Sequence, residues 1–175
     1  MSAAGPIRGL GPARDDAERS PTRGGDGARI ALFVLATVVL GGIVGATNAP
    51  DAWYRELAKP AWNPPDWVFG PVWTTLYAMI GYAGFRVWRR RGARSLLFRL
   101  WLAQLALNLA WTPLFFSLRS LPLASVEIAA LLASVATFVV LAGARERVSA
   151  WLFVPYLAWV GFASALTWTI WSLNA

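Results

Sequence analysis

Five long apolar runs alternate with charged or proline-rich segments along this 175-residue sequence. A helix of about 20 apolar residues spans a hydrocarbon core of roughly 30 Å. We therefore predict an all-α integral membrane protein. Residues 29–175 would form its membrane domain, a bundle of five transmembrane helices at about 30–47, 71–88, 96–118, 121–142 and 151–173.

Residues 1–28 differ in composition from the rest of the chain. They are rich in Gly, Pro, Arg, Asp and Ala and contain almost no large apolar side chains. Such a segment cannot bury enough surface to order itself. We predict a disordered cytoplasmic tail, and the late start and length of the first apolar run disfavour a signal peptide.

The segment between the first two predicted spans, residues 51–69, is dense in aromatic residues and proline. Pro60, Pro64 and Pro65 each remove a backbone donor and push the preceding residue toward an extended conformation. The pattern predicts a long irregular Trp/Pro-rich loop instead of a regular helix. We interpret this first loop as a cover over a binding cavity.

The amino-acid composition excludes several classes of protein and of functional site. The chain is 57% hydrophobic and 14% charged, which is too apolar for a soluble domain of this size. It contains no cysteine and no histidine, so disulfides, thiol chemistry and the usual zinc and haem-iron sites are not expected. We predict no catalytic residue, no metal and no cofactor, whereas a flat ligand held without covalent bonds remains compatible.

The net charge of +7 comes from basic residues that flank apolar runs. With five spans, 13 of the 16 basic residues fall on one side of the membrane. The positive-inside rule then places the N-terminus in the cytoplasm and the first loop and C-terminus on the outer side. The arginine block at 86–94 is interpreted as a topology signal and a contact for lipid headgroups, with a dedicated partner site less favoured. No nucleic-acid partner is expected.

Several polar and aromatic residues lie inside the predicted spans. Asn108 sits on a helical stripe of the third span with Gln104 and Trp111, and it could either join helices or contact a ligand. Glu127 is an acid within the fourth span, although its place near a helix start favours a solvated role. Tryptophans near span ends are assigned to the membrane interface: Trp88, Trp101, Trp151 and Trp171.

Three segments resemble one family of membrane proteins: WYRELAKPAWNPPDWVFGPVWTTLY, QLALNLAWTPLFF and PYLAWVGFASALTWTIWSLN. They are similar to the translocator protein family, whose bacterial members are called tryptophan-rich sensory proteins and whose animal members are called peripheral benzodiazepine receptors. The resemblance covers about residues 30–174. It implies a bacterial integral membrane protein with five helices, usually a homodimer, with the ligand among the helices beneath the first loop.

The resemblance also implies ligands and site residues. The family binds porphyrins and related tetrapyrroles, sterols, and synthetic isoquinoline carboxamides and benzodiazepines. An asparagine is common in the family where this chain has Thr167, which would change ligand preference at that end. The ligand-binding residues carried over are Tyr54, Trp73, Tyr77, Asn108, Trp111, Trp159, Ala163 and Thr167.

Three functions follow as hypotheses. The first is a membrane receptor or carrier for porphyrins or other hydrophobic small molecules, in contact with membrane lipid, with Arg55 and Lys59 meeting ligand carboxylates at the mouth. The second is an enzyme that degrades porphyrin with light or oxygen, ranked lower because His, Cys and paired carboxylates are missing. The third is a small exporter, which the lack of a visible inverted repeat does not support.

Overall fold

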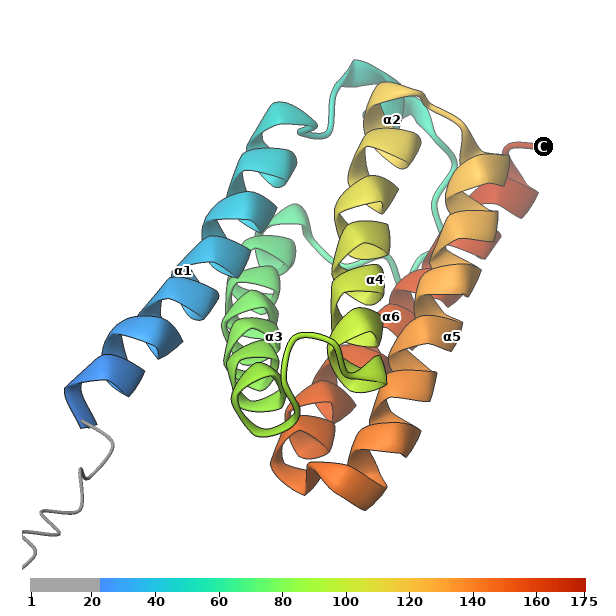
Figure 1. Cartoon of the computed structure of the whole chain (residues 1–175). Helices are drawn as coiled ribbons and strands as arrows, with labels where there is room; N and C mark the ends of the chain where they lie inside the picture. Colours follow the sequence, from blue (N-terminus) through green and yellow to red (C-terminus); the bar gives the residue numbers. More distant parts are fainter. Residues whose placement is uncertain (1–22) are drawn as a thin grey trace, which may run out of the picture.

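The computed structural model describes residues 23–175, and within that range the chain is helical and has no β-strand. The all-α prediction is confirmed. Two short irregular helices occur beside the α-helices: a 3-10 turn at Asp66–Val68 and a π-helical turn at Pro113–Ser117. The α-helices are α1 (Arg23–Thr47), α2 (Ala52–Glu56), α3 (Phe69–Arg91), α4 (Leu96–Thr112), α5 (Leu121–Arg145) and α6 (Arg147–Leu173) (Figure 1).

Four of these helices within residues 23–175 are long and apolar enough to cross a membrane. They are α1, α4 with its π-helical continuation, α5 and α6. Helix α3 has 23 residues but is less apolar, because it ends in a run of arginines and because glycine, threonine, tyrosine and tryptophan alternate with its apolar residues. The chain is therefore a helical membrane protein.

Two helix boundaries differ clearly from the sequence prediction. Helix α1 begins at Arg23, so residues 23–28 are helical and not part of a disordered tail, while residues 1–22 lie outside the described part of the chain. In the first turn of α1, Asp26 is favoured by the helix dipole and pairs with Arg89 of α3. At the same end of the bundle, Glu146 alone separates α5 from α6, where a short loop was expected.

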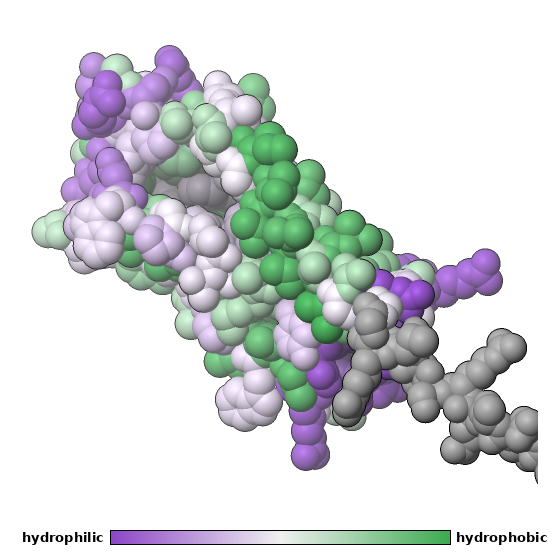
Figure 2. Space-filling view, turned by 90° about the vertical axis from the view of Figure 1, so that its left-hand side faces the viewer, coloured by the Kyte–Doolittle hydropathy of each residue, from purple (hydrophilic) through white to green (hydrophobic). Residues whose placement is uncertain are grey.

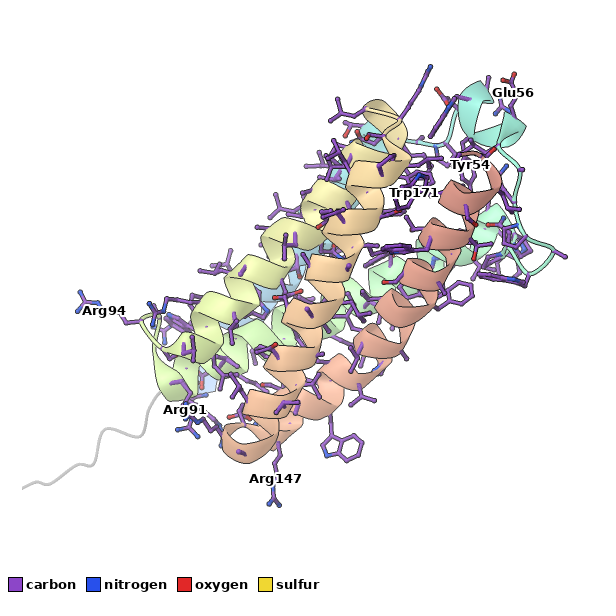
Figure 3. The ribbon with its side chains drawn as sticks, turned by 90° about the vertical axis from the view of Figure 1, so that its right-hand side faces the viewer. Tyr54, Glu56, Arg91, Arg94, Arg147 and Trp171 are labelled. Carbon is purple, nitrogen blue, oxygen red and sulfur yellow. The ribbon has the colours of Figure 1, made fainter. Side chains whose placement is uncertain are left out.

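The long helices form a closed ring. Helix α1 packs on α3, α3 on α6, α6 on α5, and α5 on α4, which in turn touches α3 and α1 (Figure 1). The end that carries Arg91, Arg94 and Arg147 lies opposite the end that carries Tyr54 and Glu56 (Figure 3). Near the arginine-bearing end, called the basic end below, the centre of the ring is filled by aromatic side chains such as Phe138 and Phe153, whose centroids are 4.0 Å apart.

Trp101 belongs to this packed core, so its assignment to the membrane interface was wrong. Its side chain is buried, and its indole Nε1 donates to the backbone oxygen of Ile80 at 2.9 Å. The ring lies against Gly84 of α3, where a Cβ atom would approach it to 2.3 Å. The sequence placed Trp101 near a span end, but the basic end of α4 packs against α3 instead of facing the headgroups.

The first loop contains more regular structure than the sequence predicted. Its prolines begin only at Pro60, so the preceding residues 52–56 are free to form α2. The Asp51 carboxylate caps this helix by accepting from the Tyr54 backbone N–H at 3.2 Å. From Leu57 onward the chain has no regular helix until the 3-10 turn that leads into α3. We keep the name first loop for residues 51–68.

Contacts to two residues outside it, Asn174 and Arg119, hold the first loop against the bundle. The Asn174 side chain accepts from the Ala58 N–H at 3.0 Å and donates to the Ala58 carbonyl at 2.9 Å. Asp51 forms a 2.8 Å ion pair with Arg119, which lies in the turn between the π-helical segment and α5 with φ of 51°. These contacts fix both the beginning and the middle of the loop.

The predicted disturbance at Pro113 takes the form of a π-helical turn. Proline has no N–H to continue the α-helical ladder. The Leu118 N–H instead bonds to the Pro113 carbonyl five residues earlier, at 2.9 Å. This wide turn presents Phe115 and Phe116 beneath the first loop, where both meet Tyr54.

Candidate ligand-binding cavity

A cavity of about 560 Å³ lies inside the helix ring beneath the first loop. Helices α1, α3, α4, α5 and α6 all contribute to its walls, together with the π-helical turn. The exposed lining residues Gly42, Gly45, Gly70 and Thr74 place its opening between α1 and the start of α3. Figure 2 shows a hollow in the surface beside the apolar face of the molecule.

The structure brings all eight residues predicted from the sequence to this one cavity. Tyr54 comes from α2 in the first loop. The others come from three long helices: Trp73 and Tyr77 from α3, Asn108 and Trp111 from α4, and Trp159, Ala163 and Thr167 from α6. Their convergence depends on α3, α4 and α6 being neighbours in the ring, with α2 packed above them.

Aromatic rings form one side of the cavity. The Trp73 ring lies 5.4 Å from Tyr77 and meets Trp159 edge-on, with centroids 6.4 Å apart and planes at 89°. Phe69, which starts α3, packs edge-on against Trp159 at 5.8 Å. Aromatic faces and edges in this arrangement offer large apolar contact area to a flat ligand.

Tyr54 closes the cavity from above. Its ring packs against Phe115 at 6.1 Å and Phe116 at 5.3 Å, and the Lys59 ammonium lies 4.5 Å from its centroid on the other side. Burial, and to a smaller extent nearby Asp66, raises the pKa of the Tyr54 phenol above its usual value. The phenol is therefore neutral at physiological pH and remains a hydrogen-bond donor.

Asn108 joins three helices. The Tyr77 hydroxyl donates to Asn108 Oδ1 at 2.6 Å, and Asn108 Nδ2 donates to the Tyr156 hydroxyl at 2.9 Å. The helix-joining role considered from the sequence is thus confirmed, and the side chain also borders the cavity. Tyr156 was missed as a partner, because only the packing of α6 against α3 and α4 reveals it.

Replacing Tyr77 with phenylalanine should lower the free energy of unfolding by about 1–2 kcal/mol. The change removes the hydroxyl that donates to Asn108 Oδ1 and leaves that buried oxygen without a donor. Thermal unfolding in detergent, followed by circular dichroism, measures the effect. Thr75→Val is the matched control on the same helix, because that hydroxyl is exposed and bonds only to its own helix at Pro71. Equal midpoints for the two variants would contradict the role of the Tyr77–Asn108 bond.

The structure gives Arg55 and Lys59 no place at the cavity, so their expected role at its mouth is withdrawn. Neither residue lines the cavity. Lys59 Nζ instead donates to the carbonyls of Arg55 and Leu57, at 3.3 and 3.2 Å, and makes a cation–π contact with the Tyr54 ring. Lys59 therefore stabilises the first loop.

Glu127 corrects another expectation. Both carboxylate oxygens are buried and have no hydrogen-bond partner among the described residues, so the solvated role favoured by the sequence was wrong. The residue precedes the fully packed Ile128 on α5 and is turned inward with it. No group of three or more His, Cys, Asp or Glu side chains that could hold a metal ion occurs within residues 23–175.

Residues missed by sequence reasoning also line the cavity. They include Gly41, Gly42 and Gly45 of α1, Phe162 of α6 and Leu131 of α5. The three glycines of α1 could equally serve close helix packing. Their spacing places them on one face of α1, but only the structure shows that this face borders a cavity.

The helical fold and this cavity define a class: a helical membrane protein with an aromatic-sided cavity among its helices and, above it, a first loop that begins with the capped helix α2. The chain belongs to the TspO/MBR family, whose model matches residues 30–172.

Named relatives agree with this assignment. A tryptophan-rich protein TspO of Chlorobaculum tepidum is 43% identical over 143 residues, which is 76% of this chain and 88% of that protein. The tryptophan-rich sensory protein of Cereibacter sphaeroides is 37% identical over 149 residues, covering 82% and 92%. The human translocator protein is 39% identical over 126 residues, covering 70% and 75%. The suspected family is confirmed.

Proposed function

We propose that this protein is a membrane receptor or carrier that binds porphyrins and similar hydrophobic molecules, such as sterols, in the cavity beneath the first loop. The observation that supports the proposal is that the eight residues carried over from the family resemblance all line one cavity, which has an aromatic side. Its volume lies within the roughly 300–1,000 Å³ of typical small-molecule pockets. A sensory or regulatory role fits the name of the Cereibacter sphaeroides relative, the tryptophan-rich sensory protein.

Two unpaired donors in the cavity wall support a ligand with polar acceptors. The indole Nε1 atoms of Trp111 and Trp159 are buried and have no hydrogen-bond partner among the described residues. Buried donors are normally satisfied. A carbonyl or carboxylate of a bound ligand would supply the acceptor, with modest movement of the rings.

We also propose how the helices cross the membrane. Helix α3 has 23 residues, and at about 1.5 Å per residue it is long enough to be the fifth span. The basic end would face the cytoplasm and the first loop and C-terminus the outer side. The exposed Ala103 and Ala106 of α4 would allow close approach of a second copy in a homodimer.

The double variant Trp73→Phe, Trp159→Phe should bind protoporphyrin IX about tenfold more weakly or worse, since both rings wall the cavity. Quenching of tryptophan fluorescence in detergent, titrated with protoporphyrin IX, measures the affinity. The matched control is Trp151→Phe, Trp168→Phe, which removes two tryptophans that are 72% and 49% exposed on the outer face of α6.

Saturable quenching weakened only by the cavity variant would support the proposal. Quenching that is absent, or that does not saturate while circular dichroism shows an intact fold, would overturn the porphyrin assignment and direct attention to sterols. Time-dependent loss of porphyrin absorbance that requires Trp73 or Trp159 would instead identify a porphyrin-degrading enzyme.

A further inference from the structure

A second cavity lies at the basic end of the bundle, between α1 and α3, away from the first loop. It has a volume of about 370 Å³. Ile30 comes from α1, and the remaining lining residues come from the last turns of α3: Tyr82, Phe85, Arg86, Arg89 and Arg90. The cavity thus combines apolar walls with guanidinium groups.

The three guanidinium groups are incompletely neutralised. Arg86 donates from Nε and Nη2 to one oxygen of Glu146, at 3.2 and 2.8 Å. The other Glu146 oxygen lies 3.4 Å from Arg90 Nε, and Arg89 pairs with Asp26. Three positive charges therefore share two carboxylates. Each guanidinium carries five N–H donors, so most donors of Arg89 and Arg90 are free of these pairs.

The arginines differ in their access to a ligand. The side chain of Arg86 is largely buried, with 17% exposed, and it is held by the Glu146 side chain, which is 2% exposed. Those of Arg89 and Arg90 are 47% and 62% exposed. The buried pair therefore fixes the floor of the cavity, and the two outer arginines form an accessible cationic rim.

We propose that this cavity binds the phosphate group of an anionic phospholipid, with Arg89 and Arg90 as its principal ligands. Guanidinium groups recognise phosphate through paired, charge-assisted hydrogen bonds. Ile30 and Phe85 give the cavity an apolar part that suits the glycerol and first acyl carbons of a lipid.

Native mass spectrometry of the full-length protein in detergent tests the proposal. The protein is equilibrated with phosphatidylglycerol or with phosphatidylcholine of the same acyl chains. We expect one phosphatidylglycerol retained in preference to phosphatidylcholine, and about tenfold weaker retention in Arg89→Gln, Arg90→Gln, which loses charge-assisted contacts.

The matched control is Arg94→Gln, Arg99→Gln, which removes the same charge from exposed positions that do not line the cavity. Equal loss in both double variants, or equal retention of the two lipids, would overturn the site.

In a second experiment, inorganic phosphate or glycerol phosphate is added to compete with the bound lipid. If either displaces the lipid at comparable concentration, the phosphate site stands and its lipid part is wrong. Protoporphyrin quenching unchanged in the Arg89, Arg90 variant would show that its fold is intact.

Discussion

Replacing Gly81 with alanine should lower the free energy of unfolding by about 3 kcal/mol. A Cβ at this position would lie 2.5 Å from Thr37 Oγ1, 2.7 Å from the Phe33 carbonyl and 2.7 Å from Val34 Cα. Two of these three atoms are backbone, so the clash is relieved only by moving α1 away from α3. That movement would also disrupt the 2.8 Å hydrogen bond from Thr37 to the Tyr77 carbonyl.

Thermal unfolding in detergent, with and without protoporphyrin IX, measures this effect. Gly143→Ala in α5 is the control, because no atom lies within 4 Å of the Cβ it would add. Alanine favours a helix over glycine by up to about 1 kcal/mol, so the control should be neutral or slightly stabilised. If Gly81→Ala also leaves the unfolding midpoint unchanged, α1 is not held against α3 at this close approach.

Replacing Glu146 with glutamine should destabilise the protein by about 3 kcal/mol. Glu146 is 4% exposed and is the single residue between α5 and α6, where its carboxylate contacts Arg86 and Arg90 of α3. Glutamine preserves the shape but removes the charge, which leaves the largely buried Arg86 guanidinium uncompensated. The variant should unfold at a lower temperature than the wild-type chain.

A double variant separates this charge effect from loss of shape. In Arg86→Met, Glu146→Gln the buried charge is gone from both sides, so much of the lost stability should return. The exposed acid Glu56→Gln is the control and should change stability by less than about 0.5 kcal/mol. If the double variant is as unstable as the sum of the two single variants, Arg86 and Glu146 contribute independently.

The helices were predictable because each contains a long apolar run bounded by charged residues or proline. Where the boundaries moved, local chemistry explains the shift. α2 forms because the prolines of the first loop begin only at Pro60. α1 extends back to Arg23 despite three glycines, and Asp26 in its first turn is favoured by the helix dipole and pairs with Arg89. Helix α3, predicted as the second span, is not among the helices apolar enough to cross a membrane, since its glycines, its aromatic residues and the arginines of its last turns lower its apolar character.

The cavity residues were predicted mainly through the family resemblance, and contacts between distant helices were not predicted. Glu146 pairs with Arg86 across 60 positions in the chain, and Asn108 meets Tyr156 across 48. Neither pairing leaves a periodic signal in one sequence, since each depends on which helices are neighbours in the ring. The solvated role predicted for Glu127 was wrong for the same reason, because its place in the fourth span is visible in the sequence but the burial of its carboxylate oxygens is not.

The three glycines on one face of α1, Gly41, Gly42 and Gly45, differ in how freely they can be substituted. Gly41 is required by the fold, because a Cβ there would lie 2.0 Å from the Tyr77 ring. Gly42 and Gly45 border the same cavity, yet no atom lies within 4 Å of the Cβ that either would carry. Packing therefore leaves Gly42 and Gly45 in this wall of the cavity open to substitution. Substitutions there can change the size of ligand that the cavity accepts, one methyl group at a time, without disturbing the fold.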